Sequence, residues 1–130
     1  MLNSQGSAAT STALLHAVDA ANTAAATSGT GLWLDVRPYD GEIIVTQNCG
    51  VVTAGTIVGK LQSATDANGT GAADISGQTF TSVGTSTDLS TQKLVVDPKT
   101  VVGGFLGYVG TITTGPAAVS VVATGKKKVV

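Results

Sequence analysis

From Gly31 onward, apolar and polar residues alternate with a period of two, which is typical of β-strands that bury one face. In "GLWLDVRPYDGEIIVTQNCG" a first alternating run is followed by a Pro-Tyr-Asp-Gly turn and the apolar run "EIIVTQN". The pattern predicts a β-hairpin, in which the Asp40-Gly41 pair supplies the positive φ of a tight turn. In the first run, Leu32, Leu34 and Val36 alternate with Trp33, Asp35 and Arg37.

The same alternation continues to the end of the chain. Further strands are predicted in "GTIVGKLQSA" (55–64), "QTFTSV" (78–83), "QKLVVD" (92–97), "GGFLGYVGTIT" (103–113) and "AAVSVVATG" (117–125). Turns rich in Gly, Asp and Pro separate them, including Thr114-Gly115-Pro116. We therefore expect an all-β fold with little helix: a single antiparallel β-sandwich of jelly-roll or immunoglobulin-like type, with seven to eight strands.

The first 30 residues are rich in Ala, Ser and Thr, and two structures compete there. Alanine favours a helix, whereas the interspersed Thr residues and the spacing of Leu14, His16 and Val18 favour a strand, which is our prediction. We expect residues 1–12 to form a flexible or partner-ordered arm and residues 13–130 to form the sandwich domain.

Composition narrows the classes of function. Only 12% of the 130 residues are charged and the formal net charge is −1, which argues against binding to nucleic acid. A surface of neutral hydroxyls and amides costs less to desolvate than one of ions, so it suits packing against protein. We find no signal peptide and no apolar run that could cross a membrane, and we expect synthesis in the cytoplasm. One cysteine, Cys49, and one histidine provide neither a disulfide nor a zinc cluster within one chain.

The stretch "DANGTGAAD" (66–74) resembles the start of a calcium-binding loop. In an EF-hand, the twelfth loop position holds a bidentate glutamate, and here that position is Gly77. The alternative is a turn in which Asp and Asn side chains bond to nearby backbone groups, and we favour this alternative.

Candidate catalytic groups are few. His16 and Asp19 have no nucleophile elbow near them, and the Gly-rich stretches match no phosphate-binding loop. We therefore predict no enzyme, and no catalytic, cofactor-binding or metal-binding residue. A glycosidase pair could be drawn from the eight acids, but four of them lie at strand ends and turns that need no catalytic explanation: Asp35, Asp40, Glu42 and Asp74.

Two surface features have alternative interpretations. Trp33 is either a packing residue in a second layer or an exposed anchor at an interface, and exposed rings at Trp33 and Tyr39 would favour binding of sugars. Lys126, Lys127 and Lys128 could contact phosphate or an acidic protein surface, but we favour a solvated chain end that protects an edge strand.

Several motifs together resemble small virion proteins of tailed bacteriophages. These motifs are an Asp-Gly turn between two strands, "QSATD", "GAADISGQTF", "YVGTI" and "VVATGKK", and the similarity extends from about Leu14 to Lys128. Gly107 departs from the family pattern, in which a larger and often basic residue is expected.

The resemblance implies a capsid decoration or cement protein on the outside of the head shell. Its partners would be the major capsid protein and further copies of itself, with a trimer favoured, and neither nucleic acid nor membrane. The alternatives are a tail or connector component, and a glycan-binding module on the virion.

Overall fold

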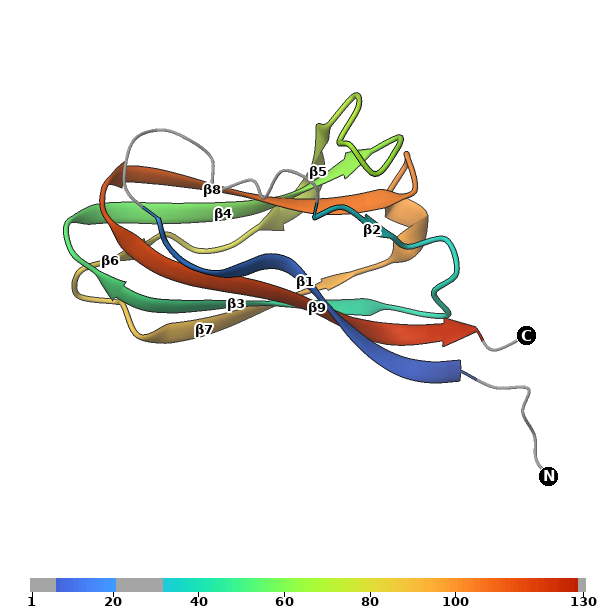
Figure 1. The fold of residues 1–130 in the computed structure, drawn as a ribbon, viewed down its shortest axis with the longest axis horizontal. Coiled ribbons are helices and arrows are strands. Elements are labelled where there is room, and N and C mark those ends of the chain that lie inside the picture. The colour runs from blue at the N-terminus through green and yellow to red at the C-terminus, as the bar shows by residue number, and fades with distance from the viewer. Residues whose placement is uncertain (1–6, 21–31, 129–130) are drawn as a thin grey trace.

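The computed structural model describes residues 7–20 and 32–128, which form two antiparallel β-sheets packed face to face (Figure 1). The expected all-β sandwich is thus confirmed. Sheet A has the order β1 (Ser7–Ala20), β9 (Ala117–Lys128), β3 (Ile43–Val52) and β7 (Ser90–Val96). Sheet B has the order β2 (Leu34–Asp35), β8 (Phe105–Thr114), β4 (Gly55–Ala64) and β5 (Ala73–Thr79), and β6 (Val83–Gly84) also pairs with β4. The only helical turn in the described residues is the 3-10 turn η1 (Pro98–Thr100).

The core lies between the sheets and follows the alternation of the sequence. In β3, Ile43, Val45 and Cys49 are buried, while Ile44 and Asn48 on the opposite face are exposed. Strands β4, β8 and β9 alternate in the same way. The largest fully buried apolar side chains are Leu14, Ile43, Ile57, Leu61, Leu106 and Ile112.

At one end of the sandwich, two adjacent turns each carry the chain from one sheet to the other. β3 of sheet A leads into β4 of sheet B, and β8 of sheet B leads into β9 of sheet A. The turns contact each other, because the Thr53 amide donates to the Pro116 carbonyl at 2.9 Å and the Gly115 amide donates to the Ala54 carbonyl at 2.9 Å. Thr114-Gly115-Pro116 thus separates two strands as expected.

The hairpin predicted between residues 32–37 and 42–48 is wrong. β2 pairs with β8 in sheet B, whereas β3 pairs with β7 and β9 in sheet A. Gly41 does have the expected positive φ of 87°. The connection nevertheless closes one end of the sandwich, because Val36 and Tyr39 are buried in the core.

The strand predicted at 78–83 is also interrupted. β5 ends at Thr79, and the buried ring of Phe80 turns the chain inward before β6 begins at Val83. At Thr81 the side chain of Gln92 replaces a neighbouring strand: its Oε1 accepts from the Thr81 amide at 2.8 Å and its Nε2 donates to the Thr81 carbonyl at 2.9 Å. This pair of bonds joins β7 of sheet A to the β5–β6 segment of sheet B.

The N-terminal region is a strand, as predicted over the helical alternative. β1 begins at Ser7, so the expected boundary at residue 12 falls inside a strand that pairs with β9. Residues 1–6 and the side chains of His16 and Val18 lie outside the described residues, whereas Leu14 is described and is buried.

The three C-terminal lysines are exposed, but they do not protect an edge strand. β9 is an internal strand of sheet A, and Lys126 to Lys128 pair with residues 7–9 of β1. On the other side, the Lys126 carbonyl accepts from the Asp40 amide at 2.6 Å, and the Lys128 amide donates to the Pro38 carbonyl at 3.0 Å. The expected edge-strand role is therefore wrong.

Candidate functional site

The loop after β4 is a turn built around one carboxylate. Oδ1 of Asp66 accepts hydrogen bonds from the amides of Asn68 and Thr70 at 2.8 and 3.1 Å, and Oδ2 accepts from the Thr70 hydroxyl at 2.7 Å. The hydroxyl, together with the backbone amides, holds the pKa of Asp66 below its ordinary value, because these bonds stabilise the ionised form. The prediction of a local turn is confirmed.

Asp74, the second acid of this loop, has different partners. Its carboxylate accepts from Nε2 of Gln62 at 2.8 Å and from Nζ of Lys60 at 3.0 Å, and these two bonds hold the pKa of Asp74 below its ordinary value. In the part of the chain that the structure describes, no three His, Cys, Asp or Glu side chains come together as a cation site would require.

Trp33 packs against the outer face of sheet B. A Cβ atom at Gly107 of β8 would overlap the Trp33 ring, and one at Gly69 would lie 2.6 Å from Nε1 of Trp33. The half-buried indole therefore fills the space that these two glycines leave open and holds the Asp66 turn against β8. Of the two interpretations of Trp33, the structure supports the second packing layer.

Tyr39 is buried, with 6% of its surface exposed. Its hydroxyl lies 3.0 Å from Oγ1 of Thr10, and Nζ of Lys127 lies 6.0 Å from the ring centroid. The exposed pair of rings that would favour sugar binding is therefore not formed by Trp33 and Tyr39.

The nearby charged residues are paired locally. Arg37 forms two side-chain hydrogen bonds to Asp35 at 2.9 and 2.8 Å, and its guanidinium lies 5.1 Å from the ring centroid of Phe105. The bond from Arg37 holds the pKa of Asp35 below its ordinary value. This arrangement accounts for Asp35 without a catalytic role.

The main polar contact of the core was not predicted from the sequence. Gln47, which is 1% exposed, accepts a hydrogen bond through Oε1 from the Tyr108 hydroxyl at 2.6 Å. Burial raises the pKa of Tyr108 above its ordinary value. Cys49 is also buried, and this burial raises the pKa of its thiol, which disfavours the reactive thiolate.

The outer face of sheet A carries few charged side chains. Three cross-strand rows lie side by side on β7, β3 and β9. We call these nine residues the sheet A face: Val95, Ile44 and Thr124; Lys93, Thr46 and Val122; Thr91, Asn48 and Ser120.

The sheet A face carries one charged residue, Lys93, among its nine. Ile44 and Val95 are 42% and 50% exposed and lie directly opposite each other. The Thr91 hydroxyl donates to Oδ1 of Asn48 at 3.0 Å, which fixes part of the polar surface in place. Such a face can pack against protein at a low desolvation cost.

Comparisons of the chain with protein-family models, with curated proteins and with solved structures find no match. Among the described residues there is also no helix with the length and apolarity needed to cross a bilayer.

Proposed function

We propose that the protein is a structural component of a tailed-bacteriophage virion, and that it decorates the outside of the head shell and stabilises it through protein–protein contacts. Its partners are the major capsid protein and further copies of the chain, in a trimer. The role is structural rather than catalytic, and it places the protein on the capsid surface of the virion after synthesis in the host cytoplasm.

The sheet A face is the observation that carries this proposal. A decoration protein needs a pre-formed surface that repeats the same contact at many sites, and β-strands hold such a surface rigidly. Eight of the nine residues in the face are uncharged, and the aliphatic pair of Ile44 and Val95 supplies apolar area. The motifs from "QSATD" to "VVATGKK" direct the proposal to a virion protein.

The two alternative functions receive less support. A glycan-binding module would need exposed rings, and Tyr39 is buried while Trp33 packs on Gly69 and Gly107. A tail or connector component would use the same neutral face in fewer copies, so the copy number in the particle distinguishes it from a decoration protein.

The attachment face is tested by binding of the purified protein to head shells of the phage that encodes it, measured by co-sedimentation. Asn48→Asp places a charge in the face with almost no change of shape, and the aspartate can still accept the bond from Thr91. Burying that carboxylate without a partner costs more than about 1.4 kcal/mol, so the apparent affinity should fall at least tenfold.

Asn68→Asp is the matched control, because it makes the same change on the exposed Asp66 turn. We expect this variant to bind shells as the wild type does. Equal binding by both variants would exclude the sheet A face, and no binding by the wild type would exclude shell attachment itself.

A further inference from the structure

One end of the sandwich presents two exposed aliphatic side chains. Leu89 and Val51 are 74% and 58% exposed. The Leu89 amide donates to the Gly50 carbonyl at 3.0 Å, which places Leu89 beside the end of β3 where Val51 lies. We call this end, made of residues 51–55, 85–89 and 114–116, the neutral tip.

The backbone of the neutral tip is held in an unfavourable conformation. Leu89 has φ of 56° and Thr114 has φ of 78°, and they are the two non-glycine residues with positive φ in the described part of the chain. Left-handed backbone is disfavoured for both side chains, and strain of this kind gathers at functional surfaces. Here the left-handed backbone directs the side chain of Leu89 outward into solvent.

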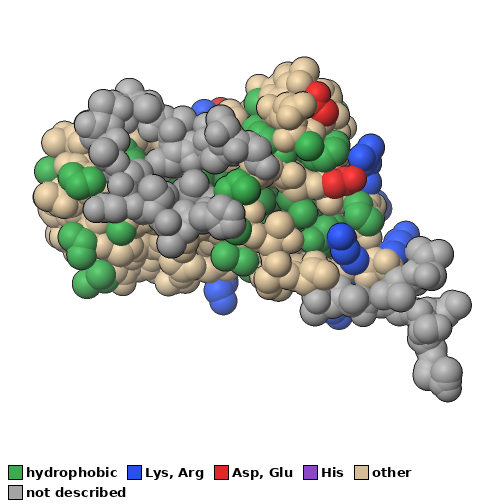
Figure 2. All heavy atoms as spheres, viewed as in Figure 1, with side chains coloured by type: hydrophobic (Ala, Val, Ile, Leu, Met, Phe, Trp, Pro, Cys, Tyr) green, Lys and Arg blue, Asp and Glu red, His purple; other side chains and the backbone are tan. Residues whose placement is uncertain are grey.

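The neutral tip also carries little charge. Its one charged residue is Asp88, whose Oδ2 accepts from the Val52 amide at 3.2 Å. In Figure 2 the left-hand end of the molecule shows apolar side chains and no Lys, Arg, Asp or Glu on the visible face. The tip therefore fits an uncharged, apolar hollow on a partner.

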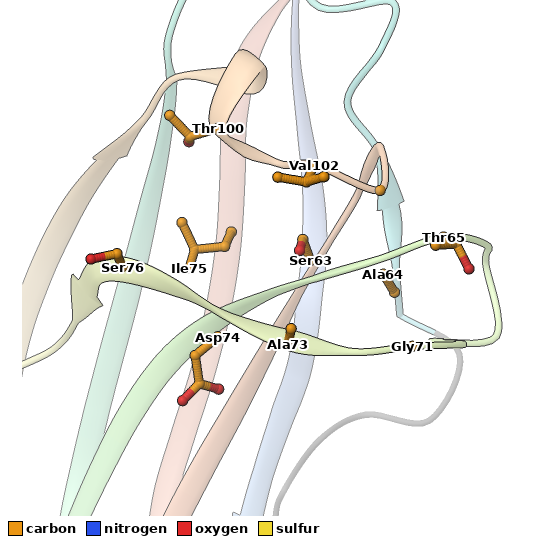
Figure 3. Close-up of a pocket in the computed structure, with 11 residues that line it drawn as sticks. Ser63, Ala64, Thr65, Gly71, Ala73, Asp74, Ile75, Ser76, Thr100 and Val102 are labelled. Atoms are coloured by element: carbon orange, nitrogen blue, oxygen red, sulfur yellow. The ribbon is translucent and has the colours of Figure 1, made fainter.

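A hollow of this kind lies on the same chain. A groove of about 620 Å³ runs between the β4–β5 hairpin and the segment that follows η1. Ile75 and Val102 supply its apolar lining, and Val102 is 91% exposed. Figure 3 shows the one charged lining residue, Asp74, with its carboxylate pointing away from Val102, and that carboxylate is paired with Lys60 and Gln62.

The tip and the groove lie at opposite ends of the molecule. β4 runs from Gly55 in the tip to Ala64 in the groove, and ten residues of strand span about 30 Å. A chain cannot fill its own groove with its own tip across that distance. The matching neutral surfaces instead suit two different copies.

We propose that copies of this chain associate head to tail, with Leu89 and Val51 of one copy inserted into the groove beside Ile75 and Val102 of the next. This inference rests on the oligomer proposed above and assigns its contact. The contact is heterologous, since each copy uses two different patches, and it closes into a ring when the rotation between copies allows. A trimer is one such ring.

Sedimentation velocity over a range of protein concentrations tests this contact in three variants. Leu89→Asn removes the apolar side chain, and asparagine tolerates positive φ, so the fold should be kept. Val102→Asn makes the same change in the groove, at a residue that is almost fully exposed. Val95→Asn changes an exposed valine of the sheet A face and serves as the control.

We expect the wild type and Val95→Asn to form the same oligomer. Leu89→Asn and Val102→Asn should each remain monomeric at protein concentrations at least tenfold above the concentration at which the wild type associates. An equal mixture of Leu89→Asn and Val102→Asn should form a dimer, because one variant keeps its groove and the other keeps its tip. A monomeric wild type, or a mixture that stays monomeric, would overturn the head-to-tail contact. Neither result would change the shell-binding measurement, which depends on the sheet A face.

Discussion

The Tyr108 hydroxyl donates a hydrogen bond of 2.6 Å to Oε1 of Gln47 in the middle of the core. Gln47 lies on β3 of sheet A and Tyr108 lies on β8 of sheet B, so this bond links the two sheets. Gly59 of β4 makes room for it, since a Cβ atom there would lie 2.5 Å from the Tyr108 hydroxyl oxygen. The core is thus organised around one polar contact as well as around apolar packing.

Removing the hydroxyl should destabilise the protein. Tyr108→Phe leaves Oε1 of Gln47 buried without a donor, and Nε2 of Gln47 has no hydrogen-bond partner among the described residues. We expect a loss of about 1–3 kcal/mol in the free energy of unfolding, measured by denaturant titration. The double variant Gln47→Met, Tyr108→Phe should recover most of this loss, because it removes both polar partners together. A double variant less stable than Tyr108→Phe would contradict this role of the bond.

The same tyrosine should make the protein sensitive to alkali. Burial raises the pKa of Tyr108 in the folded state above that of unfolded tyrosine, which is about 10. Its contribution to stability is therefore complete below about pH 10 and is lost as the pH rises toward the folded-state value. The pKa of Cys49 is also raised in the folded state, so its contribution to stability is likewise lost as the pH rises. That loss begins near the ordinary thiol pKa of about 8.5. Unfolding titrations from pH 7 to 11 should show a smaller decline above pH 10 for Tyr108→Phe than for the wild type. If the stability of both proteins declines equally above pH 10, Tyr108 is not the source of the alkali sensitivity.

The environment of the Trp33 ring should depend on Gly69, the glycine that the ring covers. Gly69 and Gly71 both have positive φ, at 80° and 67°, but a Cβ atom at Gly69 meets the indole whereas one at Gly71 meets nothing within 4 Å. Gly71→Ala therefore adds backbone strain alone, and Gly69→Ala adds strain and displaces Trp33. We expect Gly69→Ala to lower the melting temperature more, and to shift the fluorescence of this single tryptophan. Equal effects on both measurements would show that the indole does not hold the turn.

Acid should weaken the Asp66 turn. Hydrogen bonds from Thr70 and the backbone lower the folded-state pKa of Asp66 below that of an unfolded aspartate, which is about 3.9. The contribution of Asp66 is complete well above that value and is lost as the pH falls through the folded-state pKa. Unfolding titrations from pH 6 to 2 should show a shallower acid decline for Asp66→Asn. If the stability of Asp66→Asn falls with pH as steeply as that of the wild type, other carboxylates cause the acid sensitivity. Asp35 and Asp74 are candidates, because their pKa values are also lowered.

Local pattern predicted the strands better than their partners. The alternation in residues 55–64 identified β4 and the buried positions of Ile57 and Leu61, because a period of two is set by the strand itself. The pairing of β2 with β8 joins residues about 70 positions apart along the chain, and no local signal encodes it. The positive φ predicted at Gly41 is confirmed, yet a glycine in this conformation does not say that the strands on either side of it are neighbours.

The residues that matter most for the candidate sites differ in how visible they are in the sequence. In "IIVTQNCG", Gln47 lies two residues from Val45 and two from Cys49, on the strand face that is buried. Strand alternation could therefore have predicted that Gln47 is buried. The positive φ of Leu89 and Thr114 has no such signal, because glycine or asparagine is expected at those angles. The groove beside Val102 depends on how two distant segments pack and is visible only in the structure.

The proposed function is decoration of a phage head by this chain. The first experiment is to measure the copy number of the chain in purified virions, by quantitative mass spectrometry against the major capsid protein. We expect a high copy number in a fixed ratio to the capsid subunits, as repeated attachment through the sheet A face requires. A much smaller number would indicate a tail or connector component, and absence from the particle would contradict a virion role.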